Sequence, residues 1–269
     1  MDAAIVTGAG GGIGTAVAHR LADDGWSLVV ADRDPVALDR LVGELPATAV
    51  CEAVVGDVAE GDHHAVLVEA ALDLGGLGLS VLNAGVVLPG LVWELPETQW
   101  DLHVRVNLWG VVHGVRAALP VMVDNGRGHV VAVASGAGLV AAPGLSAYTA
   151  SKHAVVGLME STHHELARVA PGVGVSVVCP GNIRTPMPVT SLAAAGIEDE
   201  QLSPVAEQVA TTIRAGVDAG AEPATVADAI VDAVAERRFW VLPQPEVALG
   251  ALDRVQRIVD GRPPVDLLG

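Results

Sequence analysis

The stretch AAIVTGAGGGIG, residues 3–14, indicates how the chain folds. Residues 3–7 form a short apolar run, as expected of a buried strand. A glycine-rich turn follows, and residues 13 to about 24 have the apolar spacing of an amphipathic helix. A glycine turn between a strand and a helix points unhindered backbone N–H groups and the N-terminus of the helix toward the same place. Such a place is suited to binding a phosphate.

The glycines of this turn fall at 8, 12 and 14, in the spacing GxxxGxG. The spacing GxGxxG of many dinucleotide-binding turns does not fit the loop. Glycine also serves tight turns that bind nothing. Its place between a first strand and a first helix nevertheless favours binding. We therefore expect Gly8, Gly12, Ile13 and Gly14 at the phosphates of a dinucleotide.

The second predicted strand, residues 27–31, is closed by Asp32. An acidic residue there, about twenty residues past a glycine turn, is placed to bind the diol of an adenosine ribose. The same carboxylate would repel the 2′-phosphate of NADP, so Asp32 favours NAD. Arg33 beside it could instead accept a phosphate, and Asp-Arg-Asp-Pro is also good turn chemistry. We predict Asp32 and Arg33 at the adenosine end of bound NAD.

Beyond residue 32, apolar strand-like runs alternate with helical patterns. This alternation predicts an α/β fold with a parallel sheet covered by helices on both faces. Nothing marks a second domain, so residues 1–269 are expected to form one. Small and acidic residues at about 186–204 predict a lid over a site. Strands are expected at 49–55, 80–82, 129–134, 173–179 and 239–242, and helices at 35–45, 63–74, 98–123 (bent near Pro120), 148–169, 204–219 and from 225. No element is predicted in the proline-punctuated tail.

Tyr148 and Lys152 are the only tyrosine and the only lysine in the chain, and they are four positions apart. On a helix, that spacing puts both side chains on one face. A nearby ammonium favours the phenolate and lowers the pKa of a phenol from its ordinary ~10, which suits acid–base catalysis at neutral pH. A solvated helix face is the usual explanation for such a pair. The uniqueness of both residues argues against it here.

Composition restricts the function further. The chain has 269 residues, a net charge of −17 and a pI near 4.7, which disfavours binding to nucleic acid and to anionic membranes. No basic leader or uninterrupted apolar span is present. The two cysteines suggest no disulfide framework. We expect a cytoplasmic protein that acts on a small molecule.

Two pairs of adjacent histidines, at 63–64 and 163–164, raise the question of a metal site. Neighbours on a helix diverge, and no carboxylate or cysteine pattern converges with them. We interpret them as surface histidines and predict no metal.

Taken together, six segments resemble the short-chain dehydrogenase/reductase family. They are Thr7–Gly14 (TGxxxGIG), Asn83-Ala84-Gly85, Asn107, Ser135, the YxxxK motif at Tyr148–Lys152, and Pro180-Gly181. They occur in the family's order and spacing across nearly the whole chain. The resemblance implies one Rossmann-type domain with a doubly wound, parallel, seven-stranded sheet, usually assembled into tetramers or dimers. One departure is Ala134, where many relatives have a second serine.

The resemblance also implies roles for four catalytic residues. Tyr148 would be the general acid/base that exchanges a proton with the substrate oxygen. Lys152 would lower the pKa of that phenol and bind the nicotinamide ribose. Ser135 would hold the substrate oxygen, and Asn107 would complete a proton relay through water.

Further positions match the family's cofactor and substrate contacts. Besides Tyr148, Lys152 and the glycine turn, the cofactor would meet Asp57 and Val58 near the adenine, Asn83, Ala84 and Gly85 along the cleft, and Pro180, Gly181, Ile183 and Thr185 at the nicotinamide. Substrate would meet Ser135, Ala137, Leu139, Val140, Leu145, Tyr148 and Met187, which are mostly hydrocarbon.

We therefore expect an NAD-dependent oxidoreductase that interconverts an apolar secondary alcohol and a ketone. Two alternatives remain, an NADP-dependent reductase of carrier-bound 3-oxoacyl chains and a non-catalytic NAD(H)-binding sensor. The nearly uncharged stretch 107–123 and the apolar positions Val155, Leu158 and Met159 predict helices that pack between protomers. A homotetramer is expected, with a dimer as the alternative.

Overall fold

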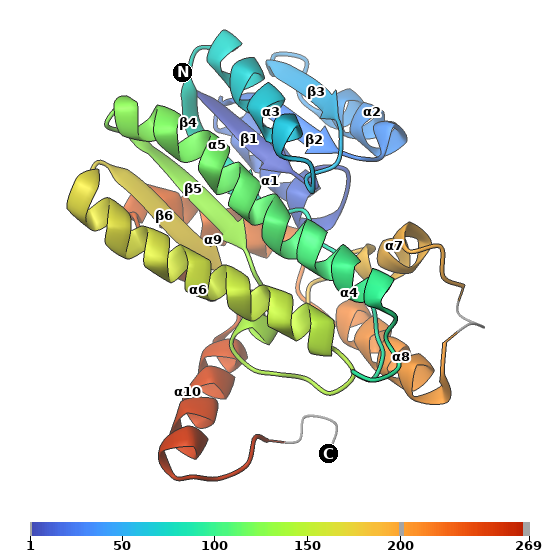
Figure 1. Ribbon diagram of the computed structural model, residues 1–269. Coiled ribbons are helices and arrows are strands. Elements are labelled where there is room, and N and C mark those ends of the chain that lie inside the picture. Colours follow the sequence, from blue (N-terminus) through green and yellow to red (C-terminus); the bar gives the residue numbers. More distant parts are fainter. Residues whose placement is uncertain (1, 199–201, 266–269) are drawn as a thin grey trace.

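The computed structural model describes residues 2–198 and 202–265 and shows a parallel sheet between two layers of helices (Figure 1). The strand order is β3-β2-β1-β4-β5-β6-β7, with all neighbours parallel. This order confirms the predicted doubly wound, seven-stranded fold. The strands are β1 Ala3–Thr7, β2 Ser27–Asp32, β3 Cys51–Val55, β4 Leu77–Leu82, β5 Gly128–Val133, β6 Val173–Val178 and β7 Trp240–Val241.

The central strands consist of nearly continuous apolar runs, because helices cover both of their faces. Every residue of β1 and of β6 is buried. At one edge, β3 is mostly exposed or half-buried. The sheet thus has a dry centre, and its order reverses between β1 and β4, where ligands bind in folds of this kind.

Three helices cover each face of the sheet. Apolar residues from α3, α5 and α6 form one core layer with the sheet. Those from α1, α2 and α9 form the other, in which α1 packs along α9. The bounds are α1 Gly12–Asp23, α2 Pro35–Glu44, α3 Gly61–Asp73, α5 Gly110–Asp124, α6 Ser146–Val169 and α9 Pro223–Glu236.

The remaining helices lie outside these two layers. α4 leads into a π-helical segment and then into α5, while α7 and α8 lie side by side and α10 projects from the body (Figure 1). Their bounds are α4 Glu97–His103, the π-helical segment Val104–Trp109, α7 Met187–Ala194, α8 Pro204–Asp218 and α10 Pro245–Val259; a short 3₁₀ turn covers Gly136–Gly138. The predicted lid, about 186–204, therefore contains α7; residues 199–201 lie outside the described part of the chain.

Three expectations were wrong. The irregularity in the long helix falls at Val104–Trp109 and not near Pro120, which lies inside α5. The tail, in which no element was predicted, contains α10. Pro245 is compatible with this helix because it occupies the first turn, where no N–H is needed. Val155 and Met159 are fully buried in their own protomer, which leaves only Leu158 of the predicted trio partly exposed.

The continuous stretch Glu97–Asp124 has the length and composition of a membrane span. However, Val111, Ala118 and Met122 of α5 are buried in the layer between α5 and the sheet. We identify this stretch as a core helix, since the core helix of a folded domain can have the same length and apolar composition as a membrane span.

Gly14 permits α1 to begin directly above the glycine turn. A Cβ at Gly14 would lie 2.0 Å from the Gly8 carbonyl oxygen and 2.7 Å from Asn83 Nδ2. Real Cβ atoms do not approach backbone this closely. Gly14 is thus required for close packing between helix and turn.

We predict that Gly14→Ala destabilises the protein by about 1–3 kcal/mol, because the turn must shift to admit the methyl group. Gly43→Ala in α2, where a Cβ would meet nothing within 4 Å, is the matched control and should stabilise by about 0.5–1 kcal/mol. Urea unfolding measures both. Equal effects of the two substitutions would contradict the packing role.

Candidate active site

A cleft of about 880 Å³ lies at the carboxyl ends of the strands. It is one continuous cavity with a polar end at Asp32 and Arg33, a glycine-lined middle and an apolar far end. Among the predicted residues it is lined by Gly8, Gly12, Ile13, Asp32, Arg33, Asp57, Val58, Asn83, Ala84, Gly85, Ser135, Ala137, Val140, Leu145, Tyr148, Lys152, Pro180, Gly181, Ile183, Thr185 and Met187. Gly14, Asn107 and Leu139 do not line it.

At the polar end, the Asp32 carboxylate is braced by backbone. Its Oδ2 accepts from the Gly10 N–H at 2.9 Å, and its Oδ1 accepts from the Asp34 N–H at 3.1 Å. Arg40 Nη2 donates to the Gly10 carbonyl oxygen at 2.9 Å. The carboxylate is therefore oriented before any ligand arrives. Sequence reasoning placed Gly10 in the turn but missed its bond to Asp32, and it missed Arg40, since nothing in the spacing of Arg40 points to the turn.

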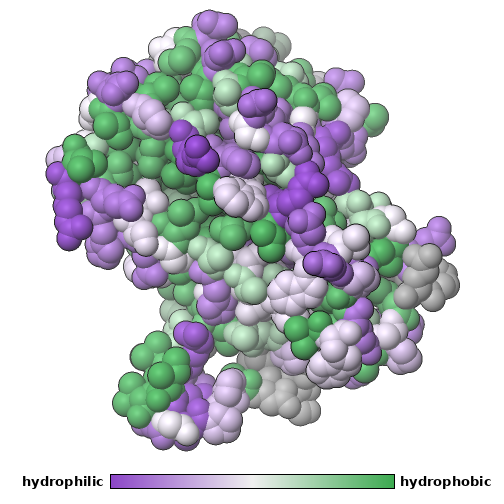
Figure 2. Space-filling view, in the orientation of Figure 1, coloured by the Kyte–Doolittle hydropathy of each residue, from purple (hydrophilic) through white to green (hydrophobic). Residues whose placement is uncertain are grey.

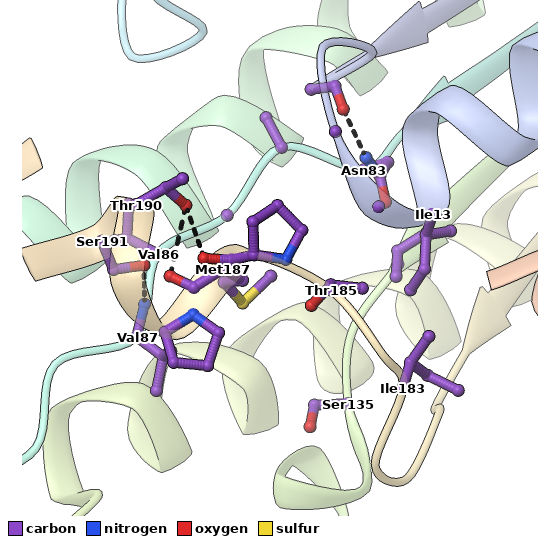
Figure 3. A pocket seen from close by; sticks show the side chains of 18 of the residues that line it. Ile13, Asn83, Val86, Val87, Ser135, Ile183, Thr185, Met187, Thr190 and Ser191 are labelled. Carbon is purple, nitrogen blue, oxygen red and sulfur yellow. Dashed lines mark hydrogen bonds between the residues drawn. The ribbon is translucent and has the colours of Figure 1, made fainter. Parts of the chain in front are cut away.

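Asn83 ties the end of β4 to the glycine turn (Figure 3). Its Nδ2 donates to the carbonyl oxygens of Thr7 at 3.0 Å and Gly8 at 3.1 Å. Its backbone N–H donates to Thr7 Oγ1 at 3.0 Å. These bonds hold two loops from neighbouring strands at a fixed spacing across the cleft.

Tyr148 and Lys152 meet as the sequence predicts, on one face of α6. The Lys152 ammonium lies 5.8 Å from the centroid of the Tyr148 ring and donates to the Val133 carbonyl oxygen at 2.9 Å. Only 9% of Tyr148 and 2% of Lys152 is exposed, so both groups work in a largely desolvated site. The end of β5 thus holds the ammonium over the phenol.

The pKa of the phenol differs from the expectation. Burial raises the pKa of Tyr148, and its interaction with the Ser135 hydroxyl opposes that rise. Burial also lowers the pKa of Lys152 to about 8. Desolvation outweighs the attraction of the ammonium, which lies over the ring. The protein alone therefore keeps the phenol protonated, and a further positive charge must favour the phenolate.

Ser135 stands where β5 ends, beside the phenol. Its Oγ accepts from the Ala137 N–H at 3.1 Å, which leaves the hydroxyl proton to donate to the phenolic oxygen or into the cavity. Cys179 is fully buried behind it, and burial raises the pKa of that thiol to about 12. The thiol is therefore a neutral packing group.

Asn107 is fully buried, and its amide is already occupied. Its Nδ2 donates to the Val86 carbonyl oxygen and to Ser151 Oγ, each at 3.0 Å, and its Oδ1 accepts from the Val86 N–H at 2.8 Å. Ser151 Oγ in turn donates to the Tyr148 carbonyl oxygen at 2.7 Å. The side chain thus links the cleft wall to α6 instead of reaching into the cavity.

The backbone N–H groups of Val86, Val87 and Leu88, which follow β4, have no partner in the sheet. Each of them donates instead to one buried side chain. Besides the Asn107 bond to Val86, Ser191 Oγ accepts from the Val87 N–H at 3.0 Å and His103 Nε2 from the Leu88 N–H at 3.1 Å. The bond from α7 to Val87 is visible in Figure 3. Sequence reasoning missed Ser191 and His103, because no local pattern predicts which distant side chain meets a loop.

His64 corrects the interpretation of the histidine pairs as surface residues. It is 3% exposed, and its Nε2 is 3.0 Å from the Val58 carbonyl oxygen, behind the adenosine end of the cleft. Burial lowers the pKa of His64 to about 4, so the ring is neutral at physiological pH. Among residues 2–198 and 202–265, no group of three or more His, Cys, Asp or Glu side chains could hold a metal ion.

The far end of the cleft is mainly hydrocarbon. Met187 reaches in from α7, and Ala137, Val140 and Leu145 come from the loop between β5 and α6 (Figure 3 shows Met187). Sequence reasoning did not find the rest of this wall, which comes from α8, α10 and the β5–α6 loop: Ala142, Ile213, Val217, Glu246, Val247 and Gly250.

A sequence model of the short chain dehydrogenase family matches residues 2–195. The chain belongs to the short-chain dehydrogenase family. This assignment confirms the family that the sequence motifs indicate, and the fold is the one expected of it.

Known proteins resemble the dehydrogenase over nearly its full length. A short chain dehydrogenase/reductase from Burkholderia phymatum, solved in complex with NAD, has a TM-score of 0.95 and 35% identity and covers 100% of this chain and 98% of its own. The CLA biosynthesis dehydrogenase/reductase of Lactiplantibacillus plantarum is 32% identical over 98% of this chain and 95% of its own length. The 1-deoxy-11-beta-hydroxypentalenate dehydrogenase of Streptomyces exfoliatus is 33% identical over 97% and 91%.

We predict that Ser191→Ala destabilises the dehydrogenase by about 1–3 kcal/mol, because the buried Val87 N–H loses its acceptor. Thr190→Val is the matched control. The Thr190 hydroxyl is exposed and bonds only to carbonyl oxygens near the start of its own helix, so its loss should change stability by less than about 0.5 kcal/mol. Urea unfolding curves compare the two variants. A Ser191 variant as stable as the Thr190 variant would exclude the proposed contribution.

Proposed function

We propose that the protein is an NAD(H)-dependent oxidoreductase that interconverts an apolar, uncharged secondary alcohol and the corresponding ketone. One observation carries the proposal. A single cavity runs from the Asp32 carboxylate to the buried Tyr148–Lys152 pair and ends in hydrocarbon. A dinucleotide fits the first part, and a small apolar molecule fits the second.

The residues of the cleft suit this cofactor. Gly8 and Gly12 have positive φ, and a Cβ on either would lie 2.8 Å or less from Ala84 Cα or Thr185 Cγ2. Their bare backbone can approach a pyrophosphate, which larger residues would prevent. Asp32 offers free lone pairs to a ribose diol and repels a 2′-phosphate. The solved relative from Burkholderia phymatum, which carries NAD, supports the same choice.

Bound NAD would supply a hydride acceptor, and its reduced form a hydride donor. The protein handles the proton. Tyr148 would take the hydroxyl proton of the alcohol during oxidation and return it to the ketone oxygen during reduction. Ser135 would donate a hydrogen bond to the same oxygen and stabilise the charge that develops there. Lys152, buried beside the phenol, would add a positive charge that favours the phenolate.

The cleft wall supports an apolar substrate. Beyond Ser135 the lining is mostly aliphatic, and Glu246 at the mouth would repel an anion. Two relatives are named as dehydrogenases of hydroxylated carboxylates, a hydroxypentalenate and D-beta-hydroxybutyrate, which supports oxidation of an alcohol but says nothing for an uncharged substrate. We further propose that the segment 186–204 acts as a lid, because α7 contributes Met187 to the cavity and contacts the cleft floor through Ser191.

We propose a homotetramer in the cytoplasm, with a dimer as the alternative and with no nucleic-acid or membrane partner. Leu119 of α5 and Leu158 of α6 remain only partly buried, and Trp109 is 45% exposed. A Cβ on Gly157 would meet nothing within 4 Å, so this side of α6 is open enough for another helix. The net charge of −17 disfavours polyanionic partners.

Tyr148→Phe should lower turnover of the best secondary alcohol by a factor of about 10²–10⁴, because the proton then has no carrier. Ser146→Ala, which removes a hydroxyl that does not line the cavity, should retain turnover. Purified protein is mixed with NAD and a panel of neutral alcohols, and absorbance of the reduced cofactor is followed. Full turnover by the Tyr148 variant would refute the assignment. A clear preference for phosphorylated or CoA-linked substrates would refute the apolar substrate.

Asp32→Asn should weaken NAD binding on the order of tenfold and narrow the preference for NAD over NADP, because a charged acceptor for the ribose diol is lost. Asp39→Asn removes the same charge from an exposed position outside the cleft and should leave both affinities unchanged. Calorimetric titration with both cofactors gives the comparison. Tighter NADP binding by the unchanged protein would favour the acyl-chain reductase, and NAD binding without turnover on any substrate would favour the sensor.

A further inference from the structure

α10 stands away from the body of the protein (Figure 1). Of its residues Pro245–Val259, only Val247 is buried. Four aliphatic side chains spaced three positions apart, and a fifth next to the last of them, are 53% to 76% exposed, and Figure 2 shows apolar side chains gathered on this projection. We call them the α10 stripe: Leu249, Leu252, Val255, Ile258 and Val259.

A stripe of this kind needs a cover. A helix of about 15 residues is marginal in water by itself, and amphipathic helices gain most of their stability by burying the apolar face. A contiguous apolar patch on a soluble protein marks an interaction site. We propose that the α10 stripe packs against a second copy of this chain about a two-fold axis, and that this contact fixes one wall of the substrate pocket.

Charge favours a second copy as the partner. Residues 245–265 are neutral, since three arginines balance three acidic residues, whereas the whole chain carries −17. Two copies of so acidic a protein repel each other across most of their surface, but not here. The six charges are Glu246, Asp253 and Asp260 against Arg254, Arg257 and Arg262. A two-fold contact uses the same patch twice, so one apolar stripe is sufficient.

A membrane is a poorer match. Helices that lie in a bilayer surface carry an excess of Lys or Arg on the polar face and often Trp or Phe on the apolar face. α10 has neither, because its arginines are balanced and it contains no aromatic residue.

The base of α10 belongs to the active site. Glu246, Val247 and Gly250 line the cleft, and Gln244 Oε1 just before the helix accepts from the Gly181 N–H at 2.9 Å. The helix is therefore tied to the cleft at one end only. A second copy that holds the stripe would fix the rest of the helix and, with it, the wall at Gly250, which lies between Leu249 and Leu252 of the stripe.

Val255→Asp/Val259→Asp introduces two charges into the stripe. The control is Val42→Asp/Val50→Asp, which makes the same two substitutions at exposed positions near the opposite edge of the sheet. In analytical ultracentrifugation, the stripe variant should form an assembly of half the mass of the unchanged protein, with a several-fold higher KM for substrate and unchanged NAD affinity. The control pair should match the unchanged protein, and so should Val255→Leu/Val259→Leu. Full-size assemblies of the stripe variant would overturn the proposal.

Hydrogen exchange gives a second test that needs no substitution. Amides of residues 247–259 should be protected in the assembled protein and exchange faster when dilution dissociates it. Exchange independent of dissociation, or binding of the unchanged protein to neutral phosphatidylcholine vesicles through α10, would overturn the proposal. The effect on KM rests on the proposed function, whereas the assembly mass and the hydrogen exchange test the stripe even if no substrate is turned over. The separate interface through α6 is tested by Leu158→Asp.

Discussion

The active site depends on one unfavourable arrangement, the burial of a phenol and an ammonium together at the end of β5. Lys152 is 2% exposed and donates a hydrogen bond to the Val133 carbonyl oxygen. Desolvation raises the pKa of Tyr148 and lowers that of Lys152, so each neutral form is favoured. Such a site responds strongly to any charge that enters it. A positive nicotinamide ring would shift the phenol toward its basic form at the moment when oxidation requires a base.

The surrounding fold holds Tyr148 and Lys152 in place, although their burial together is unfavourable. Parallel strands deliver their carboxyl ends to one edge, and side chains from later elements satisfy the loops that leave it. Asn107 joins the floor of the cleft to α6, and Ser191 joins the same floor to α7. Because these bonds are buried, each is expensive to break. The centre contrasts with α10, which lines the cleft and is tied to it only at its base.

Local patterns predicted much of this structure. The run of residues 3–14 predicted the first strand, turn and helix, and the unique Tyr148 and Lys152 predicted a shared helix face. The π-helical segment, which contains the buried Asn107, was not predictable, because no breaker residue marks it. Ser191 was missed because long-range contacts leave no periodic signal. The direction of the phenol pKa shift was also missed, since a sequence shows which charge is near but not how much water is excluded.

The central claim is that the protein alone keeps Tyr148 protonated and that the cofactor's positive charge makes it a base. Because the chain has one tyrosine, near-ultraviolet absorbance of the phenolate during a pH titration reports this group alone. The account predicts a pKa above the ordinary value of 10.0 without cofactor and a lower pKa when oxidised NAD is bound. The same titration after Lys152→Met should show a smaller decrease with NAD. A phenol that ionises below its ordinary pKa without cofactor, or whose pKa does not change when NAD binds, would contradict the account.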